Sequence, residues 1–470
     1  MNEHRFIRAL GLRDVILMNI VAVVGLRWIA RGARMGPASV TLWVLACLAF
    51  FVPLAAAVSE LSSRHPEQGG LYVWTRRAFG PVHGFICGWC LWVNNLFYFP
   101  SLLLFGAANA LAPFGASAAG LADSRTYATL FVLGGIWATV GVGILGLNTG
   151  KWLQNIGSAG IWLPAALLIA AGAYALATFG SATPFTAWSL VPPLDEGFLE
   201  TVSLWSAMCF AFSGFEITAL VGQEVKRPER TIPLGVLIGG AVAAAIYIAG
   251  SVSVLIALPV DSLRELRGIT DAIDQVGARV GLPAVTWIVG ALIALSAIAG
   301  TLSWMASAAR VPFAAGVDRV MPPVLGRLHP RFRTPHIALI VQGVVATAIF
   351  LVSVFFAMAG ARPTIQDAYD ILVNLTILIY FVPYLYLFLS LPRLRRLAGD
   401  PLPGELRIPG GWAGLWVVAL TGLAATVISL ALVFVPPPGT TSTLNYEGSL
   451  LLQALAVVGV GFLLFRRERA

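Results

Sequence analysis

Residues 211–216 read Ala-Phe-Ser-Gly-Phe-Glu and lie near the middle of an apolar run that covers about residues 200–223. An α-helix of this length can cross the ~30 Å hydrocarbon core of a lipid bilayer. Gly214 permits an unwound turn, and unwinding leaves backbone N–H and C=O groups without helical partners. Lipid offers no hydrogen bonds, so an interrupted helix at membrane depth is tolerated only where it lines a cavity. The stretch therefore predicts a cavity inside a membrane.

A second interruption is predicted in the first apolar run, about residues 14–35, at Gly25, Leu26 and Arg27. Arg27 stands about halfway through this run, and an arginine at that depth needs a partner or a cavity. Three roles are open for it. These roles are pairing with Glu216, occupying the place that a co-transported cation has in other carriers, and holding a substrate carboxylate.

Apolar runs of similar length recur along the whole chain of 470 residues, of which 11% are charged, and the mean hydropathy is +0.84. The sequence therefore predicts an all-α integral membrane protein with twelve transmembrane helices. They are expected at about residues 14–35, 38–61, 80–112, 126–146, 155–178, 200–223, 232–257, 284–310, 336–358, 367–391, 412–435 and 447–465. The net charge of +8 does not indicate nucleic-acid binding, because the basic residues are dispersed over short loops.

Lysine and arginine are distributed unevenly between alternate connections. Of the 30 basic residues, 22 fall on one side and seven on the other, while Arg27 stays inside a span. Cytoplasmic loops carry the excess of positive charge, so both termini are expected on the cytoplasmic side of a bacterial inner membrane. Arg31 and Arg34, at the end of the first run, are expected to reach the outer interface.

The two interruptions suggest an internal repeat, since each lies in the first span of a group of five spans. The first group covers about residues 14–178 and the second about residues 200–391. Five spans are an odd number, so the two groups must be inverted relative to each other. We therefore expect a transporter core over residues 1–395, followed by a segment of residues 396–470 that contains a cytoplasmic loop and the last two spans.

A zwitterionic solute would satisfy the unpaired backbone groups of two interrupted helices. Its carboxylate would lie at a half-helix N-terminus and its ammonium at a half-helix C-terminus. Asn95 in the third span and Trp304 in the eighth would complete the lining, and Glu216 is a candidate for proton coupling. No cofactor and no metal are expected, because the cysteines lie inside apolar runs and the histidines are scattered near span ends.

Three segments together resemble amino acid permeases of the amino acid–polyamine–organocation (APC) superfamily. Residues 212–216 with 224–233 resemble the sixth helix and its following loop, residues 310–335 the loop after helix eight, and residues 66–80 the loop after helix two. The resemblance implies a LeuT-like fold of two inverted five-helix repeats with two extra C-terminal helices, helices 1 and 6 broken, and transport by alternating access.

The resemblance also implies site residues. Gly25 to Arg27 match a glycine-rich break in helix one where backbone groups hold the substrate carboxylate, and Phe210 matches an aromatic gate in the family's arginine/agmatine antiporter. Glu216, Asn95 and Trp304 align with residues of helices six, three and eight. The expected substrate-binding residues are Gly25, Leu26, Arg27, Asn95, Phe210, Ser213, Gly214, Phe215 and Trp304, with Glu216 as the proton-coupling candidate.

Two departures from the family pattern bear on function. The first break contains the bulky and charged Leu26 and Arg27, and the fifth span has no lysine to mimic sodium, as some proton-driven members have. We expect a sodium-independent permease for amino acids or related amines, working by antiport or proton symport. A membrane-embedded enzyme would need acidic residues or histidines clustered at one membrane face, and a channel would need a repeated pore-lining motif.

Overall fold

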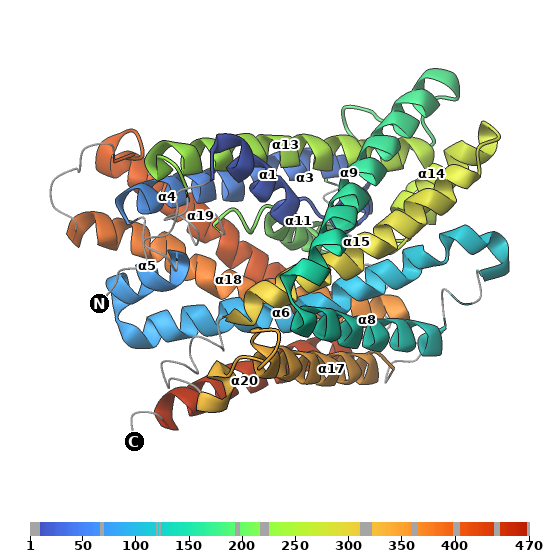
Figure 1. The fold of residues 1–470 in the computed structure, drawn as a ribbon. Coiled ribbons are helices and arrows are strands. Elements are labelled where there is room, and N and C mark those ends of the chain that lie inside the picture. The colour runs from blue at the N-terminus through green and yellow to red at the C-terminus, as the bar shows by residue number, and fades with distance from the viewer. Residues whose placement is uncertain are drawn as a thin grey trace.

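The apolar runs fold as long α-helices that lie side by side in one bundle (Figure 1). The structure, a computed structural model, describes residues 10–65, 70–118, 121, 124–192, 198–216, 225–310, 322–358, 364–397, 405–436 and 442–467. The α-helices are α1 (Leu12–Val23), α2 (Leu26–Ala33), α3 (Ser39–Ala46), α4 (Val52–Arg64), α5 (Gly70–Phe79), α6 (Pro81–Ala110), α8 (Arg125–Leu145), α9 (Leu147–Thr178), α10 (Phe198–Ser203), α11 (Trp205–Ala211), α13 (Pro228–Ala257), α14 (Gly268–Arg279), α15 (Ala284–Ala308), α17 (His336–Met358), α18 (Ile365–Leu397), α19 (Gly411–Leu432) and α20 (Thr443–Arg467). Short 3₁₀ turns are η1 (Gly36–Ala38), η3 (Ala112–Ala118), η5 (Val260–Ser262) and η6 (Pro323–Gly326).

Within the described ranges, nine helices are long and apolar enough to cross a bilayer. They coincide with nine of the predicted spans, so the expected all-helical membrane fold is confirmed. The first predicted span corresponds to the two short helices α1 and α2, and the sixth to α10 and α11 followed by residues 212–216. The last predicted span corresponds to α20.

The centre of the bundle is formed by α6 and α18, as Figure 1 shows. In each of these helices 78% of the membrane-spanning window is buried, against 28–56% in the other seven spans. The outer helices expose large apolar side chains such as Leu130 on α8 and Val417 on α19. Lipid tails are as apolar as leucine, so such surfaces are stable in a bilayer.

The second span is one continuous helix from Gly36 to Arg64 that contains a π-helical turn, η2 (Cys47–Phe51). Turns of this kind are frequent at functional sites. Here the turn carries Phe51, whose ring lies 5.5 Å from that of Phe212 and 5.1 Å from that of Phe215. The turn therefore packs against the residues that follow α11.

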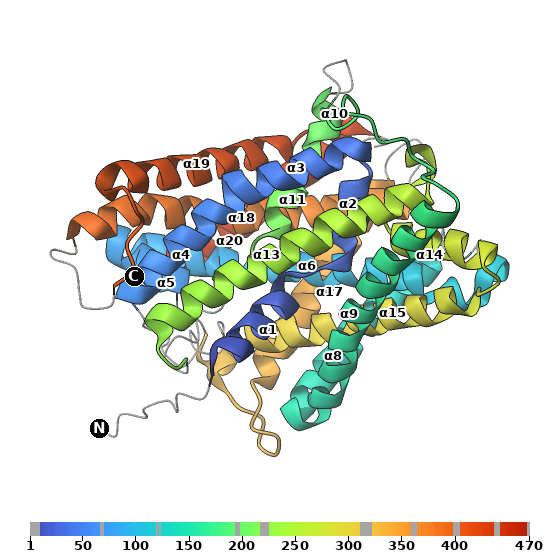
Figure 2. The same ribbon diagram turned by 90° about the horizontal axis from the view of Figure 1, so that it is seen from above.

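A long helix on one side of the bundle, α13, runs beside both α1 and α2, as seen from above in Figure 2. The connection after α13 contains the 3₁₀ turn η5 and the helix α14. Residues 311–321, part of the segment 310–335 that resembles the family's loop after helix eight, lie outside the described residues.

Candidate functional site

The first interruption consists of Val24 and Gly25, which separate α1 from α2. Both residues have extended backbone angles, with φ/ψ of −67°/104° at Val24 and −113°/116° at Gly25. The Gly25 amide donates a hydrogen bond of 3.2 Å to the Tyr247 hydroxyl, which itself donates to the Val23 carbonyl at 2.7 Å. Tyr247 belongs to α13. Its hydroxyl thus supplies partners to backbone groups that the unwinding has freed.

The second interruption consists of residues 212–216, which follow the end of α11 at Ala211. Gly214 has a φ of 104°, in the left-handed region that favours glycine. The Tyr247 hydroxyl also lies 3.2 Å from the Ala211 carbonyl. One side chain therefore contacts the ends of both α1 and α11 and brings the two interruptions together. Residues 217–223, which complete the predicted sixth span, lie outside the described residues.

The Glu216 carboxylate is buried and accepts three hydrogen bonds. The Tyr380 hydroxyl donates to Oε1 at 2.5 Å, while the Tyr384 hydroxyl and the Gly214 amide donate to Oε2 at 2.8 and 3.1 Å. Hydrogen bonds to an ionised carboxylate are among the strongest in proteins. Glu216 thus connects the second interruption to α18, which carries both tyrosines.

Arg27 is a charged residue that is buried next to the site. Its side chain is only 1% exposed, and the guanidinium lies 4.3 Å from the centre of the Trp28 ring and 4.4 Å from that of Tyr98. Among the described residues, Nη1 donates a hydrogen bond to Ser101 Oγ at 2.8 Å, whereas Nε and Nη2 are buried and find no partner there. No carboxylate of the described residues forms an ion pair with it, so the pairing with Glu216 that the sequence left open is absent here.

A small cavity lies where the two interruptions meet. It is lined by Ala22, Val23, Trp28, Asn94, Asn95, Tyr98, Phe210, Ala211, Ser213, Gly214, Trp304 and Tyr380. Its free volume of about 30 Å³ holds a few water molecules. An amino acid is larger than that, so the cavity at its size in this structure does not hold one.

Five of the predicted site residues line this cavity, namely Asn95, Phe210, Ser213, Gly214 and Trp304. The other five lie next to it. Gly25 and Leu26 lie at the start of α2, and the Arg27 guanidinium contacts the Trp28 and Tyr98 rings. Phe215 packs against Phe51, and Glu216 accepts a hydrogen bond from the Gly214 amide.

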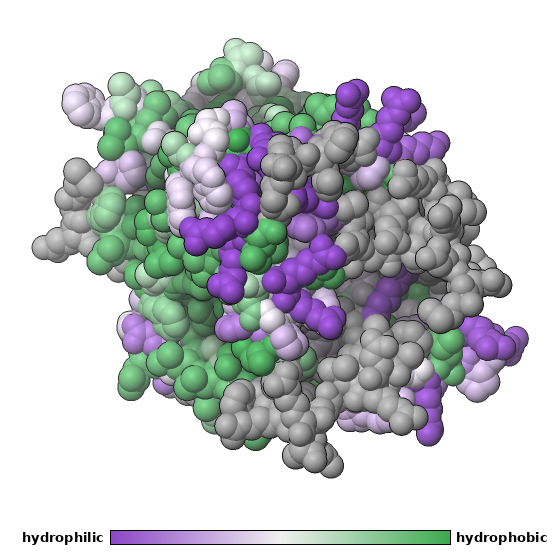
Figure 3. All heavy atoms as spheres, turned by 90° about the vertical axis from the view of Figure 1, so that its left-hand side faces the viewer, coloured by the Kyte–Doolittle hydropathy of each residue, from purple (hydrophilic) through white to green (hydrophobic). Residues whose placement is uncertain are grey.

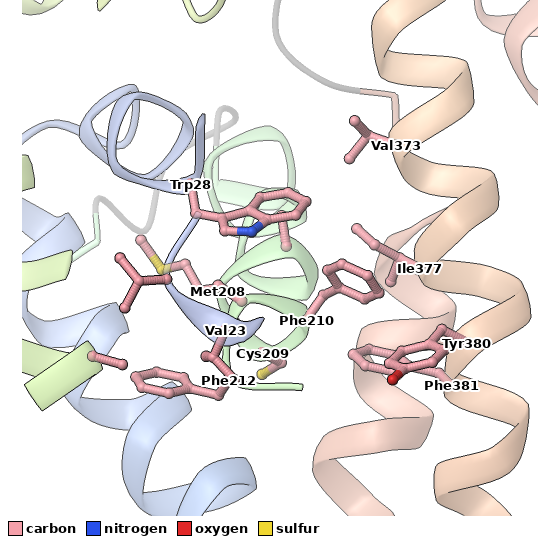
Figure 4. Packing of buried hydrophobic residues seen from close by; sticks show 14 of the residues in the cluster. Val23, Trp28, Met208, Cys209, Phe210, Phe212, Val373, Ile377, Tyr380 and Phe381 are labelled. Carbon is pink, nitrogen blue, oxygen red and sulfur yellow. The ribbon is translucent and has the colours of Figure 1, made fainter. Parts of the chain in front are cut away.

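Aromatic rings on three helices border one side of the cavity. Phe210 on α11 lies 5.3 Å from Trp28 on α2 and 5.5 Å from Tyr380 on α18, measured between ring centres. Figure 4 shows the Trp28, Phe210 and Tyr380 side chains in this order, with Phe381 beside Tyr380. Since edge-to-face rings of this kind attract one another, the row holds α2 and α18 together across α11.

The expectation that Arg31 reaches the outer interface is wrong, because its side chain is only 2% exposed. The guanidinium pairs with Glu265 at 2.6 Å and Asp370 at 2.8 Å, and it donates to Asn374 at 3.3 Å. Glu265 also pairs with Arg34 at 2.8 Å. The connection before α14 thus folds over α2 and joins it to α18 through two positive and two negative charges.

The sequence did not single out Tyr247, Tyr380 or Tyr384, which hold the two interruptions. All three are tyrosines inside apolar helices, where a hydroxyl needs a hydrogen-bond partner. That signal could have marked them. Their partners could not be inferred, because those partners are backbone groups and a carboxylate more than 30 residues away in sequence.

We expect Tyr247→Phe to destabilise the protein. The variant leaves the Gly25 amide and the Val23 carbonyl without this partner, at a cost of roughly 1–3 kcal/mol for each buried group. Thermal unfolding of the purified protein would measure the loss. The control is Tyr127→Phe, whose hydroxyl contacts one carbonyl at a partly exposed position, and an equal loss in both variants would contradict the proposed role of Tyr247.

A cavity lined by non-helical backbone inside a membrane bundle is typical of secondary transporters. The comparison with known families agrees: the model described as "Amino acid permease" matches residues 10–461, so the chain belongs to this family of transporters. It is a multi-pass membrane transporter and not an enzyme.

Similar proteins support this assignment. The chain is 27% identical to an uncharacterized transporter of Legionella pneumophila over 92% of this chain and 90% of that protein. It is 25% identical to the "Probable agmatine/putrescine antiporter AguD" of Lactococcus lactis, over 97% of this chain and 95% of that one. The crystal structure of MhsT in complex with L-phenylalanine has the same fold, with a TM-score of 0.62 and 16% identity, over 89% of this chain and 98% of MhsT.

Proposed function

We propose that this permease carries an amino acid or a related amine that binds in the cavity between the two interruptions. The observation that supports this most directly is the position of two buried ionisable groups beside the cavity, Arg27 and Glu216. A zwitterion offers a complementary charge to each of them. AguD is named for amines and MhsT was crystallised with an amino acid, so both solute classes are represented among the similar proteins.

The proposed pose places the solute's amine near Ser213, Gly214 and Glu216 and its carboxylate near the start of α2. The backbone at Gly25 and Leu26 would face the carboxylate, and Arg27 would reach it once the Trp28 and Tyr98 rings move. Asn95, Phe210 and Trp304 would surround the rest of the solute, while Phe215 would contribute through its backbone.

The finer architecture is part of the proposal. We infer twelve transmembrane helices in a LeuT-like arrangement, with helices 1 and 6 broken. Two inverted repeats would cover about residues 14–178 and 200–391, within a core of residues 1–395, and residues 396–470 would add the last two helices. Both termini would face the cytoplasm of a bacterial inner membrane, as the distribution of basic residues favours.

Transport would follow alternating access, either as antiport or as proton symport with Glu216 as the proton carrier. Protonation would turn one carboxylate oxygen into a donor, so at least one of the three hydrogen bonds that Glu216 accepts would have to change. That change would loosen the contact between the second interruption and α18. Proton binding and opening of the cavity would then be coupled.

Uptake into proteoliposomes tests the proposal. Purified protein would be reconstituted with no internal solute, with internal amino acid or with internal amine, at equal or different pH on the two sides. We expect labelled amino acid or polyamine to accumulate, driven by internal solute for an antiporter and by an inward proton gradient for a symporter. Absence of flux for every amino acid and amine would overturn the proposal, and unitary currents in planar bilayers would instead indicate a channel.

A further inference from the structure

A second, larger depression lies at one end of α18 and α19, away from the cavity of the two interruptions. Its volume is about 470 Å³, and Phe79 of α5 forms part of its wall. Apolar side chains of α18 and α19, among them Leu389, Leu420 and Leu423, line most of it. Leu389 and Leu420 are exposed by 44% and 55%, so the groove is open on the side that the outer helices present to lipid.

Two arginines, Arg393 and Arg396, line the same groove. They are three residues apart on α18 and therefore project from one face of the helix. Arg395 between them turns away and donates from Nε to Glu60 at 2.6 Å. The Arg393 guanidinium lies 5.2 Å from the centre of the Phe79 ring.

The charge of the groove is not compensated by its own lining. No acidic residue is among the lining residues, and within the part of the chain that the structure describes neither Arg393 nor Arg396 forms an ion pair. Figure 3 looks onto this end of the molecule, where hydrophilic side chains gather next to a hydrophobic surface. Trp416, 43% exposed, lies in the groove wall, and tryptophan prefers the level of the lipid headgroups.

We propose that this groove binds an anionic phospholipid. The headgroup phosphate would lie between Arg393 and Arg396, and an acyl chain would follow Leu389, Leu420 and Leu423. Basic pockets between transmembrane helices recognise anionic headgroups in this way, and arginine matches phosphate oxygens with two parallel donors. A free anion would gain nothing from the apolar walls, so the lipid is the occupant that uses both halves of the groove.

The test is lipid retention by the full-length protein in native mass spectrometry, with phosphatidylglycerol and phosphatidylcholine of identical acyl chains. The wild type should retain phosphatidylglycerol preferentially, and the double variant Arg393→Gln/Arg396→Gln should bind it roughly 25-fold more weakly, since each arginine contributes about fivefold. The control Arg13→Gln/Arg230→Gln removes the same charge at exposed positions outside the groove, and it should bind phosphatidylglycerol like the wild type.

Three results would overturn the proposal. The first is equal retention of the two lipids by the wild type. The second is equal loss in the groove variant and the control variant, which would indicate a general effect of charge. The third is displacement of phosphatidylglycerol by millimolar inorganic phosphate, which would make the site a plain anion site. All four substituted side chains are exposed, so the variants should fold, and thermal unfolding would verify that.

Discussion

Replacing Arg27 with methionine should weaken the binding of carboxylated substrates roughly ten- to hundredfold while leaving the stability of the protein almost unchanged. Stacking on two rings stabilises a desolvated guanidinium by about 2 kcal/mol for each ring. Burying an incompletely paired charge costs several kcal/mol, so the two contributions nearly cancel. Loss of a charged hydrogen bond to substrate, by contrast, costs about 1.5–3 kcal/mol, or roughly ten- to hundredfold in affinity.

Arg31 provides a matched control, because it lies one turn further along α2 and is equally buried. In Arg31→Met the Asp370 carboxylate loses its cationic partner, while Glu265 keeps its ion pair with Arg34. Leaving a buried charge uncompensated costs about 3–5 kcal/mol. We therefore expect a clearly lower melting temperature for Arg31→Met than for Arg27→Met. The melting temperature of each variant, measured with and without substrate, separates the two roles.

The choice of solute makes the prediction for Arg27 specific. An amino acid and its decarboxylated amine differ only by the carboxylate, so Arg27→Met should weaken binding of the amino acid much more than binding of the amine. Equal weakening of both would show that the guanidinium does not bind the carboxylate. Unfolding of Arg27→Met to the same extent as Arg31→Met would instead give Arg27 a purely structural role.

Glu216→Gln is expected to slow transport at least tenfold and to remove its dependence on pH. Glutamine resembles the protonated carboxyl group, so the variant is fixed in the state that proton binding would create. If a proton on Glu216 accompanies the solute, wild-type uptake rises as the external pH falls from 8 to 5, and the uptake of the variant stays flat. Initial rates of labelled uptake at a series of pH values would measure both.

The control for Glu216 keeps the carboxylate and removes one donor. Tyr384→Phe deletes a single hydrogen bond to Oε2, while those from Tyr380 and Gly214 are retained. This variant should be slower than the wild type and still respond to pH. A pH response that persists unchanged in Glu216→Gln would exclude this residue as the proton carrier.

The positions of the helices could be predicted from the sequence, because membrane spans follow from local hydropathy alone. The non-helical backbone at Gly25 and Gly214 lies where the sequence predicts interruptions, since both glycines stand inside apolar runs. The burial of Arg31 could not. Its partners Glu265 and Asp370 come from a connection and a helix more than 200 residues away, and only the packed structure brings them to α2.

The candidate site, too, could be predicted from the sequence only in part. Asn95 and Trp304 were expected to line a pocket because they are polar or amphipathic groups in apolar spans, and both do. Phe215 was also expected in the site, but it is not among the residues that line the cavity, and its ring packs against Phe51. The sequence does not predict that contact, because Phe51 belongs to a helix more than 160 residues away.

The contact between α13 and the first span has a mechanical consequence. Gly235 lies against Val15 of α1 and Gly250 against Ile29 of α2, so closely that a Cβ atom would come within 2.4 and 2.8 Å of these neighbours. Tyr247 is bonded to the joint between the two halves. An unwound segment between two helices can act as a hinge, but here both helices pack against one continuous helix. We therefore expect α1 and α2 to move together with α13 during transport.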